Sequence, residues 1–133
     1  MTDVLKLAER FVAAIETGDF ETMRACYAPH AVIWHNTDGL ENPGQDRDAN
    51  VKVLAWMRRR LTAYRYDIIR REATRDGFFQ QHVLRGTTTA GEPFALAAAI
   101  ICKVENGQIT RLDEYMREAD AEPLSRAPAA SKT

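Results

Sequence analysis

The chain has 133 residues, of which 45% are hydrophobic and 28% are charged, and its formal net charge is -1. This length is typical of one domain with one hydrophobic core. The near-zero charge argues against a basic protein that binds nucleic acid by neutralising phosphates. No run approaches the ~20 apolar residues of a membrane span, and residues 1–15 lack a secretory pattern. Cys26 and Cys102 are far apart and lack the spacing of a disulfide framework or a zinc site, so they fit free thiols in a reducing compartment. Together these features predict a soluble cytoplasmic protein.

The first half of the sequence predicts mainly helices. Residues 1–15 place apolar side chains at helical spacing, which indicates an amphipathic helix with one buried face. Gly18 is expected to end this helix, and Asp19 to begin a short second one that continues through Tyr27. Residues 46–64 predict a third helix, again with apolar residues on one face.

The second half changes to a period of about two, which is typical of β-strands. One earlier strand is expected at residues 31–36, where β-branched and aromatic residues follow Pro29. Four further strands are expected at residues 66–74, 78–89, 93–105 and 109–118. Asp-Gly and Asn-Gly pairs between them favour tight hairpins, so these four strands should form an antiparallel meander.

These elements predict an α+β fold, a cone-shaped curved antiparallel sheet wrapped by three N-terminal helices. The domain is expected to span residues 1–118, and residues 119–133, rich in Ala, Pro and Ser, to form a flexible tail. Residues 94–104 are apolar on both faces of their strand, so both faces should be covered. A second copy of the chain would cover the outer face in a two-fold homodimer. Alternatively, a strongly coiled sheet folds over its own edge.

Strand alternation places a carboxylate among apolar neighbours on the inner face of the last strand. Glu114 shares that face with Leu112 and Met116. An ionised carboxylate there is costly unless it is paired, and such carboxylates are often functional. We expect Leu112, Met116 and Tyr27 to form the apolar part of a substrate pocket.

Two other strands are expected to add polar residues to this interior. Gln80 and His82 share one face of their strand, and Trp34 and Asn36 share one face of theirs. A carboxylate beside an imidazole can transfer protons, so Glu114 and His82 are the predicted catalytic residues. Asn36 and Gln80 would orient a substrate oxygen or a water, and Trp34 would form a flat wall.

Structural interpretations of the same residues are also open. Glu114 and His82 would form a satisfied buried pair without catalytic meaning, and Trp34 would be an ordinary core residue. His35 has the opposite alternation to Trp34 and Asn36, so we expect it to be structural or interfacial.

Arginine clusters at residues 58–60 and 70–71 predict solvated surface rather than a binding patch. The sequence lacks a P-loop, a nucleophile elbow, a zinc-protease motif and calcium-ligand spacing. We therefore expect neither a cofactor nor a metal, and no nucleic-acid or membrane partner.

Four segments have a recognisable pattern: residues 17–20 (Thr-Gly-Asp-Phe), 27–32 (Tyr-Ala-Pro-His-Ala-Val), 34–36 (Trp-His-Asn) and 106–115 (Asn-Gly-Gln-Ile-Thr-Arg-Leu-Asp-Glu-Tyr). With these segments the chain resembles the SnoaL-like polyketide cyclase family within the nuclear transport factor 2-like superfamily. The resemblance covers residues 1–117 and implies a cone with an internal pocket. The superfamily includes ketosteroid isomerase-like, polyketide cyclase, limonene epoxide hydrolase-like and dehydratase enzymes, and members with no known catalysis.

The resemblance implies that Glu114 is a general acid or base, because the cyclase and epoxide hydrolase branches carry an acidic residue before this aromatic. The sequence departs from the epoxide hydrolases at residues 82–84, where His-Val-Leu replaces Arg-x-Asp, and at residues 112–114 and Arg117. The resemblance therefore implies cofactor-free acid–base chemistry on a small hydrophobic molecule. Because of these departures, it does not imply epoxide hydrolysis. A non-catalytic ligand-binding or dimeric accessory module, and a partner-binding protein that uses the apolar sheet face, are the alternatives.

Overall fold

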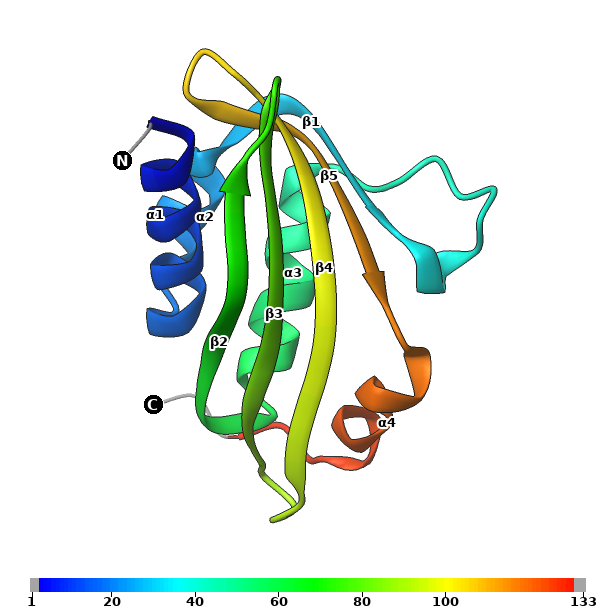
Figure 1. The fold of residues 1–133 in the computed structure, drawn as a ribbon. Coiled ribbons are helices and arrows are strands. Elements are labelled where there is room, and N and C mark those ends of the chain that lie inside the picture. The colour runs from blue at the N-terminus through cyan, green and yellow to red at the C-terminus, as the bar shows by residue number, and fades with distance from the viewer. Residues whose placement is uncertain (1–2, 131–133) are drawn as a thin grey trace.

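The computed structural model describes residues 3–130 and contains four α-helices, one short 3-10 helix and five strands (Figure 1). The helices are α1 (Asp3–Thr17), α2 (Phe20–Cys26), η1 (Asn36–Asp38), α3 (Arg47–Arg58) and α4 (Glu118–Arg126). The strands are β1 (Tyr27–His35), β2 (Leu61–Ala73), β3 (Gly77–Thr88), β4 (Pro93–Glu105) and β5 (Gln108–Met116). This is the predicted α+β cone, with the described helices gathered around one curved sheet.

The five strands form a single sheet in the order β1-β5-β4-β3-β2. Strands β2 to β5 pair antiparallel in succession, which confirms the predicted meander. Strand β1 pairs parallel with β5, so the sheet is mixed rather than wholly antiparallel. The parallel pairing is possible because α3 and strands β2 to β4 lie between the two strands in the chain.

Two glycines fix tight points of the meander. Asn106 and Gly107 have φ angles of 51° and 75°, as the type I′ turn of a two-residue hairpin requires. At Gly77 an added Cβ would lie 1.8 Å from the carbonyl oxygen of Cys102. Because both strands approach so closely there, any larger residue would force β3 and β4 apart.

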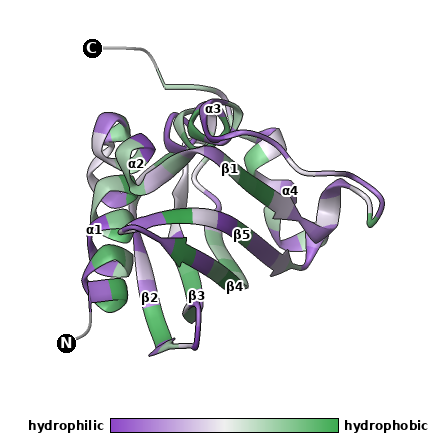
Figure 2. Cartoon of the chain, turned by 90° about the horizontal axis from the view of Figure 1, so that it is seen from above, coloured by the Kyte–Doolittle hydropathy of each residue, from purple (hydrophilic) through white to green (hydrophobic). Residues whose placement is uncertain are grey.

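The helices cover the concave face of the sheet and close the core. Helix α1 contacts β2 and β3, and α3 contacts β1 and β2. Figure 2, seen from above, shows α1 along β2 and α3 beside β1, so the helices close one side of the curved sheet. Helix α1 buries the face formed by Leu7, Ala8, Phe11, Val12, Ala14 and Ile15. Among the described residues, no helix has the length and apolarity that a bilayer crossing requires.

Two predicted boundaries are wrong. The second helix ends at Cys26, and β1 starts at Tyr27, so Pro29 lies within the strand. Proline is tolerated there because β1 is an edge strand. The third helix ends at Arg58 instead of residue 64, because β2 begins at Leu61 and extends its pairing with β3.

Part of the segment that was expected to be a flexible tail, residues 119–133, is helical in the structure. Helix α4 follows β5 almost directly and buries Leu124, and Ala127 just after the helix is also buried. Beyond the helix, the backbone N–H of Ala130 donates to the carbonyl oxygen of Arg59. Apolar burial and this hydrogen bond outweigh the weak helix propensity of this segment. Residues 131–133 of the predicted tail lie outside the described residues.

Candidate active site

The interior of the cone contains two adjoining cavities, of about 50 and 240 Å³. Both are lined by His35, Leu54, Tyr66, His82 and Glu114, which come from five different elements. The smaller cavity extends toward α1, and the larger one extends between α3, η1 and α4. Apolar residues form most of the remaining wall of the larger cavity, with Val53, Trp56, Met57, Leu84, Leu96, Met116, Ala121 and Leu124.

Glu114 is held by a histidine on the neighbouring strand. The Nε2 atom of His35 lies 3.1 Å from Oε1 of Glu114, and His35 Nδ1 lies 3.5 Å from Oδ2 of Asp38. Burial opposes a charged imidazole, but the hydrogen bonds and negative charges of Glu114 and Asp38 outweigh it and raise the pKa of His35. His35 is therefore more readily protonated than a free imidazole, and it orients the Glu114 carboxylate.

The pKa of His82 on β3 is shifted in the opposite direction from that of His35. Burial is the main cause that lowers its pKa; the charge of Glu114 opposes this effect, and that of Arg71 adds to it. Its Nδ1 atom lies 2.9 Å from Nε2 of Gln80, and Oε1 of Gln80 accepts a hydrogen bond of 2.8 Å from Nε of Arg71. The site thus combines an imidazole whose pKa is raised, His35, with one whose pKa is lowered, His82.

Tyr66 on β2 completes the polar part of both cavities. Its ring centroid lies 4.9 Å from that of His82. Burial, with the charge of Glu114 as the next cause, raises the pKa of Tyr66 well above 10.0. The phenol therefore keeps its proton at neutral pH and can donate a hydrogen bond to a bound molecule.

The structure brings together six of the eight side chains that the sequence placed in the pocket. Glu114, His82, Gln80, Leu112 and Tyr27 line the smaller cavity, and Met116 lines the larger one with Glu114 and His82. Within residues 3–130, Glu114 pairs with His35 and His82 hydrogen-bonds with Gln80, and the two residues do not hydrogen-bond to each other. Glu114 and His82 therefore do not form the mutually satisfied buried pair that was the structural alternative.

The hydroxyl of Tyr27 has a structural partner. It donates to Oδ1 of Asn50 at 2.8 Å, and Asn50 in turn donates to Oε1 of Gln45 at 3.2 Å. These bonds join β1 to the start of α3 behind the smaller cavity. Tyr27 therefore contributes its ring to the cavity wall, while its hydroxyl serves the fold.

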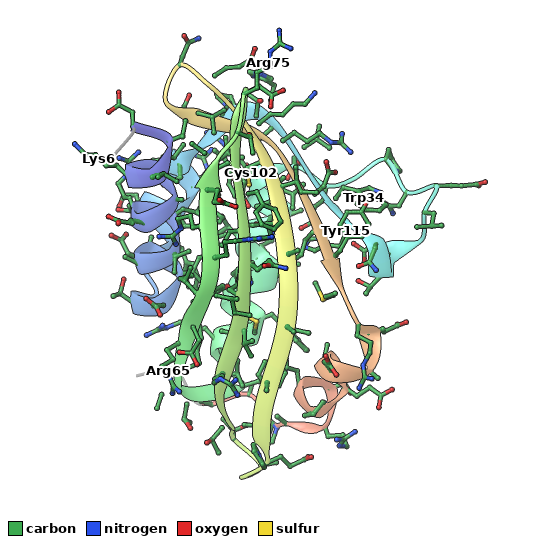
Figure 3. All side chains as sticks on the ribbon, viewed as in Figure 1. Lys6, Trp34, Arg65, Arg75, Cys102 and Tyr115 are labelled. Carbon is green, nitrogen blue, oxygen red and sulfur yellow. The ribbon has the colours of Figure 1, made fainter. Side chains whose placement is uncertain are left out.

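The expected inward positions of Trp34 and Asn36 are wrong. Trp34 packs edge to face against Tyr115 on the outer side of the sheet, with a centroid distance of 5.4 Å (Figure 3). Asn36 pairs with the backbone of Met116, donating to its carbonyl oxygen and accepting from its N–H, both at 3.0 Å. The alternation of β1 is the reverse of the expected one, because the register places His35 opposite Glu114.

Sequence reasoning missed three residues of this site. His35 was expected to be structural or interfacial, Arg71 to be solvated, and Tyr66 received no role. Strand alternation alone does not say which parity faces inward, and β1 carries apolar residues on both. For Tyr66 the available signal was an aromatic residue at the first position of the predicted strand, residues 66–74.

The curved mixed sheet, with titratable side chains at the centre of an apolar interior, has the fold of nuclear transport factor 2-like proteins of known structure. The sequence model of the SnoaL-like domain matches residues 8–112, more than half of the chain. The chain therefore belongs to the SnoaL-like family. No curated protein matches it.

Solved structures with the same fold come from several kinds of protein. IdmH from Streptomyces antibioticus, proposed to be a polyketide cyclase, is 22% identical, with a TM-score of 0.77 over 93% of this chain and 99% of IdmH. An epoxide hydrolase from M. tuberculosis, similar to limonene epoxide hydrolases, is 17% identical, with a TM-score of 0.72 over 94% and 91%. A Catenulispora acidiphila protein with a ketosteroid isomerase-like fold, solved with trimethylamine, is 16% identical, with a TM-score of 0.73 over 96% and 97%. At these identities the likeness establishes the fold.

Proposed function

We propose that this protein binds a small hydrophobic organic molecule in the 240 Å³ cavity and carries out cofactor-free acid–base chemistry on it. The reaction would be of the isomerase, cyclase, dehydratase or hydrolase type. One observation carries the proposal: the Glu114 carboxylate faces the same apolar cavity as two neutral hydrogen-bond donors, His82 and Tyr66. A few convergent polar groups in an apolar pocket are typical of ligand sites.

Glu114, His82 and Tyr66 together could remove a proton beside a carbonyl group and stabilise the charge that develops on its oxygen. Glu114 would accept a proton from the carbon beside the carbonyl, and His35 would hold the carboxylate in place. His82 and Tyr66 would donate hydrogen bonds to the oxygen on which negative charge develops. The same carboxylate would return the proton to another carbon or to a leaving hydroxyl.

Hydrogen–deuterium exchange tests this proposal without knowledge of the natural substrate. Cyclic ketones small enough for the cavity are incubated with the protein in D2O, and deuterium at the carbon beside the carbonyl is followed by mass spectrometry. We expect catalysed exchange with the unaltered protein and a loss of about 100-fold or more with Glu114→Gln. Asp113→Asn, next in the chain but on the outer face, is the matched control and should keep the activity.

A ligand-binding module without catalysis is the second candidate, and the same panel separates the two. The half-exposed Val53 and Trp56 give the larger cavity an apolar rim on α3 that would admit such ligands. Saturable ketone binding that shifts the melting temperature, with no exchange above the level of Glu114→Gln, would favour the binding module and overturn the enzymatic proposal.

We also propose that the protein acts as a homodimer joined through the outer face of β4. That face carries Ala95, Ala97 and Ile101, and Ile101 is 47% exposed beside Tyr115, which is 49% exposed. A two-fold axis would let this apolar surface cover itself. Sedimentation should give a dimer, and Ile101→Asp a monomer, whereas the distant Ser125→Asp should leave the mass unchanged. A monomeric unaltered protein would contradict the proposal.

The two cysteines, Cys26 and Cys102, are buried and free. Unpaired thiols fit the reducing cytoplasm, where we propose that the protein acts.

A further inference from the structure

We infer that Arg71 and Gln80 are positioning residues that hold His82 in a single tautomer, with its proton on Nε2 and available to the cavity. Neither residue needs to touch the substrate. The catalytic meaning of this arrangement rests on the proposed function, but the tautomer itself can be observed without any reaction.

The first step of the argument is the orientation of the Gln80 amide. Nε of Arg71 lies 2.8 Å from Oε1 of Gln80. A guanidinium group has donors and no acceptor, so the oxygen of Gln80 must face Arg71. Gln80 is fully buried, so water cannot compensate for a reversed amide. Its NH₂ group is thereby directed toward His82.

The second step is the protonation of the imidazole. Nε2 of Gln80 lies 2.9 Å from Nδ1 of His82 and can only donate, so Nδ1 must be an acceptor. Burial and the positive charge of Arg71 also disfavour the imidazolium, although Glu114 opposes them, and the pKa of His82 is lowered. A neutral imidazole that accepts at Nδ1 carries its one proton on Nε2. That proton is the one a substrate oxygen in the cavity would meet.

The strand register explains how the largely polar end of β2 supplies the contact between Arg71 and Gln80. Arg71 lies directly opposite Gln80 in the β2–β3 pairing. An irregularity between Ile68 and Arg70 shifts the alternation of β2, so Tyr66 and Arg71 both face inward despite their odd spacing. Arg70, by contrast, is exposed and lies over the ring of Phe79 on the other face. The two adjacent arginines therefore have different surroundings.

Nitrogen NMR of the histidines tests the inference directly. The chain has three histidines, His30, His35 and His82, so ¹⁵N-labelled imidazoles can be assigned with His82→Asn. Long-range ¹H–¹⁵N spectra distinguish a protonated ring nitrogen from an unprotonated one. At neutral pH we expect His82 to show an unprotonated Nδ1 and a protonated Nε2. A proton on Nδ1 in the unaltered protein would overturn the inference, whatever the variants do.

Two substitutions should change the tautomer in defined ways. Gln80→Glu keeps the shape and the contact with Arg71 but presents an acceptor to His82, so Nδ1 should become protonated and the pKa of His82 should rise. Arg71→Met leaves the amide free to turn, so both tautomers should appear. Gln81→Glu and Arg70→Met, next in the chain on the opposite face, are the matched controls. An unchanged His82 spectrum in folded Gln80→Glu would overturn the inference.

The exchange assay separates this inference from the proposed function. In Gln80→Glu we expect kcat to fall on the order of 100-fold, with little change in KM and with an altered pH profile. If neither the unaltered protein nor any variant catalyses exchange but the NMR spectra behave as stated, the proposed function fails and the tautomer assignment stands. If exchange is catalysed and Gln80→Glu alters neither spectrum nor kcat, the assignment fails and the function stands.

Discussion

Nε2 of His35 lies 3.1 Å from Oε1 of Glu114, and this contact depends on the parallel pairing of β1 with β5. The two residues are far apart in the sequence but directly opposite in the register. Residues opposite each other on neighbouring strands project to the same face, so the register brings the imidazole to the carboxylate. The charge state of His35 and the geometry of Glu114 are therefore coupled.

Substitution of Glu114 should change how His35 titrates. Glu114→Gln removes the largest of the causes that raise the pKa of His35, so burial should bring that pKa down. Asp38→Asn removes the smaller contribution and should lower the pKa less. Both shifts can be followed by NMR titration of the imidazole. An unchanged His35 titration in Glu114→Gln would contradict the contact.

The pH dependence of stability should reveal His35 independently of any activity. Because its folded pKa is raised above the ordinary value of 6.5, its stabilisation is complete below that pH and is lost as the pH rises through the folded pKa. Urea unfolding between about pH 6 and 8 should therefore show a declining free energy, with a slope of at most ~1.4 kcal/mol per pH unit from this residue.

His35→Gln supplies the control for that decline, because it removes the titrating group. The His35→Gln variant should be less stable at the acidic end and show a flatter profile. His82 has the opposite sign: its pKa is lowered, so its contribution is present above 6.5 and is lost as the pH falls through its folded pKa. An equally steep decline in His35→Gln would assign the effect to another group.

Tyr27→Phe should destabilise the fold by about 1–3 kcal/mol, because it leaves the buried Oδ1 of Asn50 without its donor. Tyr115→Phe is the matched control, since Tyr115 is half exposed, and its effect should stay within about 0.5 kcal/mol. Equilibrium urea unfolding measures both. Equal stabilities of the two variants would mean that water replaces the lost hydroxyl.

Leu124→Ala should test whether α4 is part of the folded core. Leu124 is buried and lines the larger cavity, so its truncation should cost about 2–4 kcal/mol of unfolding free energy. Leu40→Ala, at a residue that is 78% exposed, should cost almost nothing. If both variants unfold at the same urea concentration, α4 does not contribute to stability in solution.

The regular elements were predictable because they depend on local patterns. The amphipathic face of α1 and the turn at Asn106 are encoded within a few residues, and the antiparallel meander follows from such turns. The pairing partner of β1 is different, since no local signal joins it to β5. Helix α4 was missed for the same reason: its stability comes from the burial of Leu124 against distant residues.

For the site, the sequence by itself determined that a carboxylate and an imidazole, Glu114 and His82, lie on the inner face of an α+β cone. In these two strands, alternation together with apolar neighbours such as Leu84 and Leu112 marks the buried side. Only the tertiary structure decided that His35 faces inward and that Arg71 is directed toward Gln80. His35 depends on the register between β1 and β5, and Arg71 on an irregularity in β2. A shift of one residue reverses which side chains face the core.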